Sequence, residues 1–122
     1  MRAMPTDFRD GKTFPRRGRE QMGEALWLLR ASDKGRAAAA GTIHDYIYPC
    51  PMDRGMFERW RIDTAEFDRA LREHPTDEAL YAWFQQRVRP EDVRAANEWL
   101  LRERVENLDR QDAEEVGVAE HR

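Results

Sequence analysis

Four stretches between Met52 and Leu100 carry large apolar residues three, four or seven positions apart, which is the spacing of one face of an α-helix. Each stretch follows a residue that commonly starts a helix: Pro51, Asp63, Thr76 or Pro90. The pattern therefore predicts four helices in this half of the chain, the first at 52–60 and the second ending before Pro75. Nine residues form the predicted core: Leu26, Leu29, Phe57, Trp60, Phe67, Leu71, Leu80, Trp83 and Leu100.

The first half of the chain gives two more helix signals and one extended stretch. Helical spacing from Met22 to Leu29 predicts a helix at 19–31. Ser32 is a suitable N-cap for a second helix at 33–40, which Gly41 would end. Residues 42–51 are rich in β-branched and aromatic side chains, with prolines on both sides of Cys50. They predict an extended connection with at most one short strand, and no sheet.

Length and composition fit a single small domain. The 122 residues suffice for one modest core, and four Trp, five Phe and three Tyr supply large apolar area although 37% of residues are charged. We expect an all-α, single-domain bundle of about five helices with one extended Tyr/Pro/Cys connection. Residues 1–18 are predicted to be a flexible N-terminal arm, 19–110 the helical domain, and 111–122 an acidic C-terminal tail.

The same numbers argue against several function classes. A net charge of −3 gives no electrostatic basis for binding nucleic acid or an anionic membrane. The single cysteine excludes an intramolecular disulfide and any multi-cysteine zinc site. Ser32 is the only serine, which disfavours a Ser-His-Asp hydrolase. With neither a secretory signal nor an apolar run of about 20 residues, we expect a cytoplasmic protein without a cofactor.

The segment from Asp33 to Asp53 holds the residues best suited to chemistry. Cys50 would stand near the N-cap of the 52–60 helix, where the helix terminus stabilises a thiolate. His44 or Tyr48 would then serve as its proton partner. The alternative is that Cys50 is a small buried apolar residue, because Asp53 three positions later opposes a thiolate.

A group of charges in this segment also has two interpretations. Lys34 at a helix start could bind phosphate or carboxylate together with free backbone N–H groups. The alternative is a structural cluster in which Arg36 pairs with a carboxylate such as Asp53. In either case we expect Asp33, Lys34, Arg36 and Asp53 to lie near one another.

Two further features of the segment bear on ligand binding. Tyr46 and Tyr48 would face the same way in an extended chain, as the wall of a ligand pocket or as a cover over the core. The spacings of the possible metal ligands match no recognised motif, so no metal is expected. These residues are His44, Asp45, Cys50, Asp53 and His74.

Several of these stretches resemble one bacterial family. The strongest is Tyr46-Ile47-Tyr48-Pro49-Cys50-Pro51-Met52-Asp53, preceded by Asp33-Lys34-x-Arg36-Ala37 and Gly41 and followed by Phe57, Ile62-Asp63 and Phe67. A second group is Pro90-Glu91-Asp92-Val93, Asn97, Trp99 and Leu100. Over roughly residues 20 to 101 the chain resembles the family known as domain of unknown function 5069. The resemblance implies a small bacterial helical domain and brings no activity with it.

Two functional hypotheses follow. The first is a binding module that recognises a protein partner or a small anionic ligand, and the scarcity of catalytic side chains favours it over an enzyme. The second is a small thiol-dependent enzyme or redox protein that uses Cys50, with His44 or Tyr48 as proton partner and Lys34 and Arg36 holding an anionic substrate.

Overall fold

The computed structural model describes residues 4–120, with side chains described as far as Glu115. This part of the chain contains six helices and no strand beyond an isolated bridge between Met22 and Ala25. The helices are α1 (Leu28–Ala40), α2 (Pro51–Trp60), α3 (Thr64–Glu73), α4 (Asp77–Arg87), α5 (Pro90–Glu103) and α6 (Val105–Glu120). The predicted all-α class is confirmed, and the expected count of about five helices is close.

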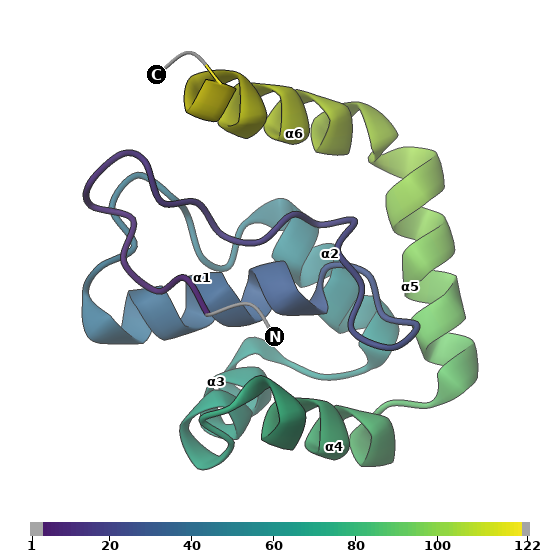
Figure 1. The fold of residues 1–122 in the computed structure, drawn as a ribbon. Helices are drawn as coiled ribbons and strands as arrows, with labels where there is room; N and C mark the ends of the chain where they lie inside the picture. Colours follow the sequence, from purple (N-terminus) through teal and green to yellow (C-terminus); the bar gives the residue numbers. More distant parts are fainter. Residues whose placement is uncertain (1–3, 121–122) are drawn as a thin grey trace.

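The helices stack in three levels around α1 and α2 (Figure 1). α3 and α4 lie on one side of this central pair, and α6 lies on the other. α5 stands along the edge, packs against α2 and joins the outer levels. Residues 4–27, which precede α1, contain no helix and run between α1 and α6. As a result, α1 is covered on all sides except at its C-terminal end.

Local capping chemistry explains where most helices begin and end. Cys50 is the N-cap of α2, with Pro51 in the first turn. Asp63 and Thr76 cap α3 and α4 by accepting the backbone N–H groups of Glu66 and Ala79. Gly41 ends α1 with φ 74°, a left-handed conformation that glycine adopts without strain. These boundaries match those expected from the sequence.

The two predicted helices at 19–31 and 33–40 are wrong, because one helix, α1, spans residues 28–40. Ser32 lies inside α1 and donates its hydroxyl to the carbonyl of Leu29 at 2.8 Å, so it caps nothing. Residues 19–27 are irregular, and Trp27 before the helix has φ 70°. Their apolar side chains reach the core from a turning segment, which produced a helix-like spacing without a helix.

The segment before α1 packs firmly although it lacks helices. Phe8 is 1% exposed, and its N–H donates to the carbonyl of Thr42 at 3.0 Å. Phe8 also meets the ring of Tyr46 edge-on. Residues 4–18 therefore contribute to the interior, while residues 1–3 lie outside the described part of the chain. The proposed division at residues 18 and 110 stays a prediction.

The C-terminal region forms two helices that run in different directions. α5 ends at Glu103, its C-cap Arg104 has φ −125°, and α6 turns back across the molecule (Figure 1). Of the acidic tail, residues 111–120 are helical, and residues 121–122 lie outside the described range. Two of its carboxylates attach α6 to the rest of the domain, since Asp112 pairs with Arg19 and Glu115 pairs with Arg30.

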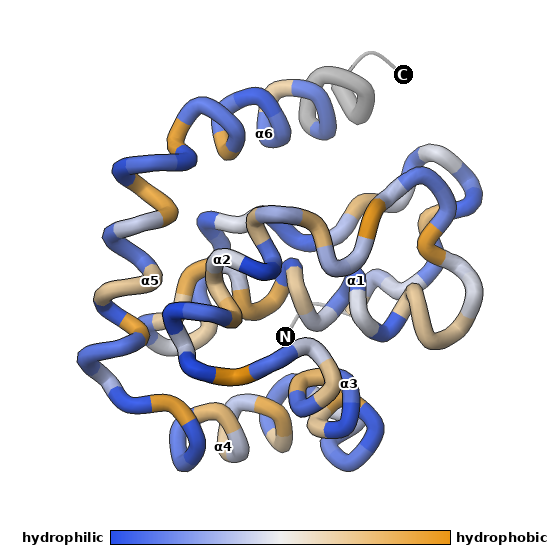
Figure 2. The backbone as a smooth tube through the Cα atoms, turned by 180° about the vertical axis from the view of Figure 1, so that it is seen from behind, coloured by the Kyte–Doolittle hydropathy of each residue, from blue (hydrophilic) through white to orange (hydrophobic). Residues whose placement is uncertain are grey.

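Eight of the nine predicted core residues are buried, and Trp83 is the exception. Trp83 of α4 is only partly buried. Its ring stacks against that of His74, the C-cap residue of α3. Figure 2 shows hydrophilic positions along the outer edge of α5 and apolar ones on its inner side. The interior also contains Trp27, Leu28, Met56, Phe84 and Leu108.

Truncating Phe67 to alanine should cost about 3–5 kcal/mol of unfolding free energy, because its ring is fully buried. Trp83→Ala should cost clearly less, since part of that ring is already in water. Urea unfolding followed by circular dichroism measures both. Equal losses for the two variants would contradict the difference in burial.

Candidate functional site

Two open hollows are lined in part by the connection between α1 and α2, and they lie on different sides of it. The α1–α3 groove has a volume of about 780 Å³. Its lining is Thr6, Gly35, Arg36, Ala38, Ala39, Ala40, Tyr48, Pro49, Thr64, Asp68, Leu71 and Arg72. The Cys50 hollow, about 490 Å³, lies between the connection and α6. It is lined by Phe14, Arg30, Lys34, Asp45, Tyr46, Ile47, Cys50, Arg110, Gln111, Glu114 and Glu115.

A buried arginine connects three segments of the fold. Arg16 is 3% exposed and donates to both oxygens of Asp33 and both of Asp77, at 2.7–3.0 Å. Burial alone would lower the pKa of Arg16, but the hydrogen bonds that Arg16 donates to Asp77 and Asp33 outweigh this effect and raise that pKa. The segment before α1 is thereby tied to α1 and to the first turn of α4.

A second buried ion pair links α1 to the start of α2. Lys34 Nζ lies 2.8 Å from Asp53 Oδ2, and both side chains are almost completely buried. The indole N–H of Trp27 donates to Asp53 Oδ1 at 2.7 Å, and the Cys50 N–H donates to Oδ2 at 2.9 Å. Asp53 thus has three donors in the interior, which compensates for the loss of its hydration.

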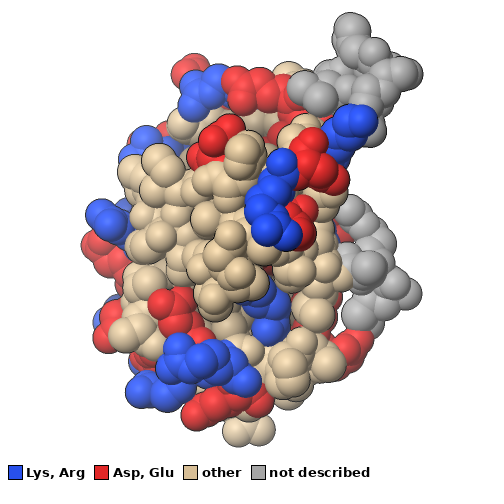
Figure 3. Space-filling view, turned by 90° about the vertical axis from the view of Figure 1, so that its left-hand side faces the viewer, with Lys and Arg blue, Asp and Glu red and all other residues tan. Residues whose placement is uncertain are grey.

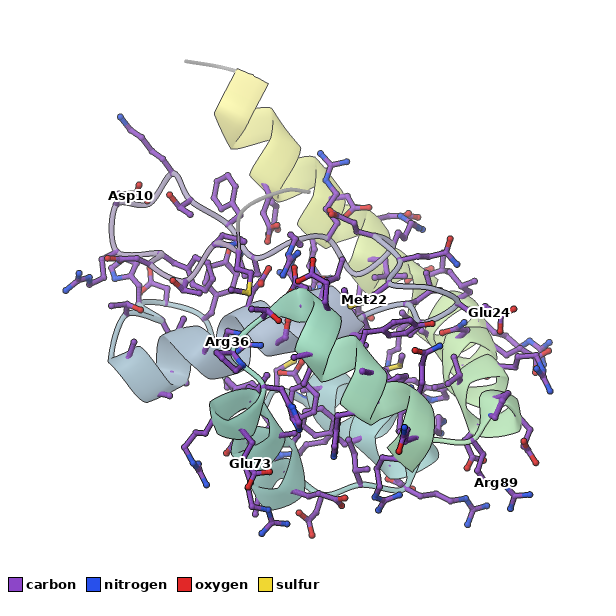
Figure 4. The ribbon with its side chains drawn as sticks, turned by 60° about the horizontal axis from the view of Figure 1, so that its bottom comes forward. Asp10, Met22, Glu24, Arg36, Glu73 and Arg89 are labelled. Atoms are coloured by element: carbon purple, nitrogen blue, oxygen red, sulfur yellow. The ribbon has the colours of Figure 1, made fainter. Side chains whose placement is uncertain are left out.

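The structure brings together only part of the predicted charge cluster. Lys34 and Asp53 meet as expected, but Asp33 points instead to Arg16. Arg36 does not pair with Asp53, and this prediction is wrong. Arg36 crosses from α1 to the C-terminal end of α3 and donates to two carbonyls there (Figure 4). The reason is helical geometry, since residues two positions apart lie on different faces of one helix.

Cys50 has a cation as its side-chain neighbour. Lys34 Nζ lies 3.2 Å from the Cys50 sulfur, which also accepts the Asp53 N–H at 3.5 Å. The predicted proton partners are engaged elsewhere. His44 is exposed and lies 3.4 Å from Asp45, and the Tyr48 hydroxyl donates to Asp68 at 2.7 Å.

Tyr46 and Tyr48 serve different hollows, so the expectation that they face the same way is wrong. The chain turns at residues 44–45 and 48–49 and is not extended. The Tyr46 hydroxyl donates to Glu115 of α6 at 3.2 Å, whereas Tyr48 points to Asp68 of α3. Burial is the main cause that raises the pKa of both tyrosines, and the nearby carboxylates add to it.

The α1–α3 groove combines small apolar walls with a half-buried cation. Ala38, Ala39 and Ala40 present only methyl groups, and Leu71 and Pro49 complete the apolar lining. Gly35 lets the helices approach, because a Cβ there would lie 2.5 Å from a Leu71 methyl. Figure 3 shows the side of the molecule that lies at the left of Figure 1, where α1 ends. Uncharged surface covers a broad area of this side, and most charged side chains lie around its margins.

Arg36 is the charged group on the α1 side of the groove. Its Nη1 and Nη2 donate to the carbonyls of Leu71 and His74, each at 3.0 Å, while its buried Nε has no hydrogen-bond partner. Burial lowers the pKa of Arg36, against the opposing effect of Asp77 and Asp33. An anion that enters the groove would stabilise this guanidinium electrostatically.

Two features of the described residues bear on other function classes. No three His, Cys, Asp or Glu side chains among residues 4–115 lie together as metal ligands would. No helix within residues 4–120 is long and apolar enough to cross a membrane.

Comparison with known proteins places the chain in a family. A family model described as "Domain of unknown function (DUF5069)" matches residues 12–121. The chain belongs to this family. The match begins before Arg16 and continues through α6, so it also covers residues 12–19 and 102–121, which the resemblance over residues 20–101 left out. No curated protein matches the sequence.

In this DUF5069 domain, the contacts that shape the hollows come partly from residues that sequence patterns do not mark. Arg16 lies in a segment rich in Pro and Gly, with no periodicity that indicates burial. Arg30 is 2% exposed and pairs with Glu115, although 85 residues separate them in sequence. A charge in an irregular segment is usually solvated, so only the tertiary structure identifies these two arginines as interior groups.

Replacing Arg16 by alanine should destabilise the domain by about 3–5 kcal/mol, because Asp33 and Asp77 would stay buried without a partner. Arg9→Ala is the matched control, since Arg9 also pairs with an aspartate but its side chain is 63% exposed. That variant should unfold almost as the wild type does. Chemical denaturation measures both, and similar stabilities for the two variants would show that the Arg16 network is dispensable.

Proposed function

We propose that the protein is a binding module that holds a segment of a partner protein in the α1–α3 groove. The observation that supports this most is the groove itself. At about 780 Å³ it is larger than the Cys50 hollow, its walls are mainly apolar, and Arg36, Asp68 and Thr64 contribute polar groups to its lining. Hollows of this kind are where proteins usually bind ligands.

The surrounding surface makes the groove distinctive. Few large apolar side chains are exposed in the described part of the chain: Ile47, Leu101 and Val105. The groove is therefore a concave apolar area on a domain in which 37% of residues are charged. Three successive alanines at the end of α1 leave room for side chains of a partner. Concave apolar area with a polar edge is typical of peptide-binding surfaces.

Photo-crosslinking tests this proposal. Benzoylphenylalanine at Ala39, an exposed residue of the groove, should give a discrete adduct in a lysate of the organism that encodes the protein. The same probe at Ala95, an exposed alanine on α5, is the matched control and should not. Unlabelled wild-type protein should compete with the Ala39 adduct, whereas unlabelled Ala39→Trp, which fills the groove, should not compete.

Circular dichroism and thermal melts of Ala39→Trp and Ala95→Trp should resemble those of the wild type, because both side chains point to solvent. If Ala39→Trp competes as well as the wild type, the partner does not use the groove. Equal adducts from the two probe positions would have the same meaning.

A second candidate function, thiol chemistry at Cys50, is supported by the Lys34 contact. An ammonium group beside a thiol and a helix N-terminus both stabilise the reactive thiolate. Lys34 lies 3.2 Å from the sulfur, and both residues line the open Cys50 hollow. Arg36 faces the other hollow, so only Lys34 of the two predicted cations is available to an anionic substrate here.

Alkylation of Cys50 by iodoacetamide tests the thiol candidate, because Cys50 is the only cysteine. Lys34→Met should slow the reaction several-fold at neutral pH, whereas Lys34→Arg keeps the charge and should preserve most of the rate. If Lys34→Met does not fold, the native wild-type thiol should still react faster than the same thiol in urea. A native rate below the rate in urea would contradict thiol chemistry.

A further inference from the structure

We propose that the α1–α3 groove recognises a carboxylate next to an apolar side chain, with Arg36 and Arg72 receiving the carboxylate. This inference rests on the proposed function, because it specifies the chemistry of the segment that the groove would hold. It is carried by the charge balance of the groove and by the unusual surroundings of Arg36.

The three cations of α1 are not equivalent. Arg30 pairs with Glu115 at 2.8 Å, and Lys34 pairs with Asp53 at 2.8 Å. Among the described residues, Arg36 has no carboxylate within ion-pair distance, although its side chain is half-buried. Removing a charge from water is costly when it has no charged partner, so a half-buried, unpaired guanidinium beside an open groove points to an anion that binds there.

The hydrogen bonds of Arg36 leave part of its capacity unused. A guanidinium has five N–H donors. Two of them serve the carbonyls of Leu71 and His74, and Nε is buried without a partner. Carbonyl oxygens accept hydrogen bonds but do not neutralise a charge. A carboxylate near the two remaining Nη hydrogens would supply both hydrogen-bond acceptors and a compensating negative charge. Arginine commonly binds carboxylates in this way, through two parallel N–H···O bonds.

The rest of the lining indicates how many charges the ligand has. Arg36, Arg72 and Asp68 are the charged residues of the groove, so its lining carries one excess positive charge. Asp68 is held against the wall as the acceptor of the Tyr48 hydroxyl. One excess charge suits a monoanion such as a carboxylate. The adjoining alanine methyls, Leu71 and Pro49 suit an aliphatic side chain beside it.

Two probes that differ only in charge test the inference. N-acetyl-leucine has the carboxylate and the apolar side chain, and N-acetyl-leucinamide has the same side chain without the charge. In a titration followed by ¹⁵N NMR, the acid should shift the backbone signals of Gly35, Ala39 and Leu71 to saturation. The amide should bind about tenfold more weakly, the loss expected when a charge-assisted hydrogen bond disappears.

Arg72→Gln should weaken binding of the acid and leave binding of the amide unchanged. Arg69→Gln is the matched control, because Arg69 is an exposed arginine of the same helix that does not line the groove. Both positions are exposed, so both variants should fold and keep the test interpretable. Inorganic phosphate, titrated in parallel, should shift these signals less than the acid does.

Each outcome decides a separate point. Equal binding of acid and amide would overturn the carboxylate inference while the crosslink at Ala39 could still establish the groove as a protein-binding site. No saturating shift from either probe would overturn the inference outright, as would phosphate binding as tightly as the acid. Binding of the acid without any protein adduct at Ala39 would support the carboxylate chemistry and contradict the proposed function.

Discussion

The fold depends on Arg16, whose guanidinium lies in the interior between Asp33 and Asp77. This one side chain connects three segments that have little else in common: the irregular N-terminal stretch, the middle of α1 and the start of α4. Burying these charges costs solvation free energy, and the four hydrogen bonds recover it only in one arrangement. The network thereby selects a particular packing of the helices, which apolar contacts alone specify less sharply.

The orientation of α1 in this network also determines how its side chains reach the two hollows. Because Asp33 turns toward Arg16, its neighbour Lys34 turns toward α2, where Asp53 and the Cys50 sulfur receive it. Arg36, two positions later, reaches α3 and the groove. The orientation of one buried helix therefore determines which cation each hollow obtains. The two candidate sites are not independent features of the surface.

Sequence reasoning succeeded where the controlling contacts are local and failed where they are distant. The Asp63 and Thr76 caps act within a few residues, and so the starts of α3 and α4 could be predicted. Serine is a common N-cap residue, but α1 continues through Ser32 because Asp33 pairs with Arg16, 17 residues away. The contact of Lys34 with Asp53 could be expected from charge balance. The Arg36 contacts with α3 required knowledge of how the helices pack.

The attachment of α6 has a consequence for how the molecule opens. Among its residues 105–115, only Leu108 is buried, while the pairs Arg19–Asp109, Arg19–Asp112 and Arg30–Glu115 join the helix to the body. The pairs of Arg19 are exposed, so dissolved salt screens them, whereas it hardly affects the apolar interior. We therefore expect salt to weaken the attachment of α6 more than the packing of the other helices, although the largely buried Arg30–Glu115 pair and Leu108 still hold it. Its release would uncover the wall of the hollow that contains Cys50, so the accessibility of the thiol would report on the attachment of the helix.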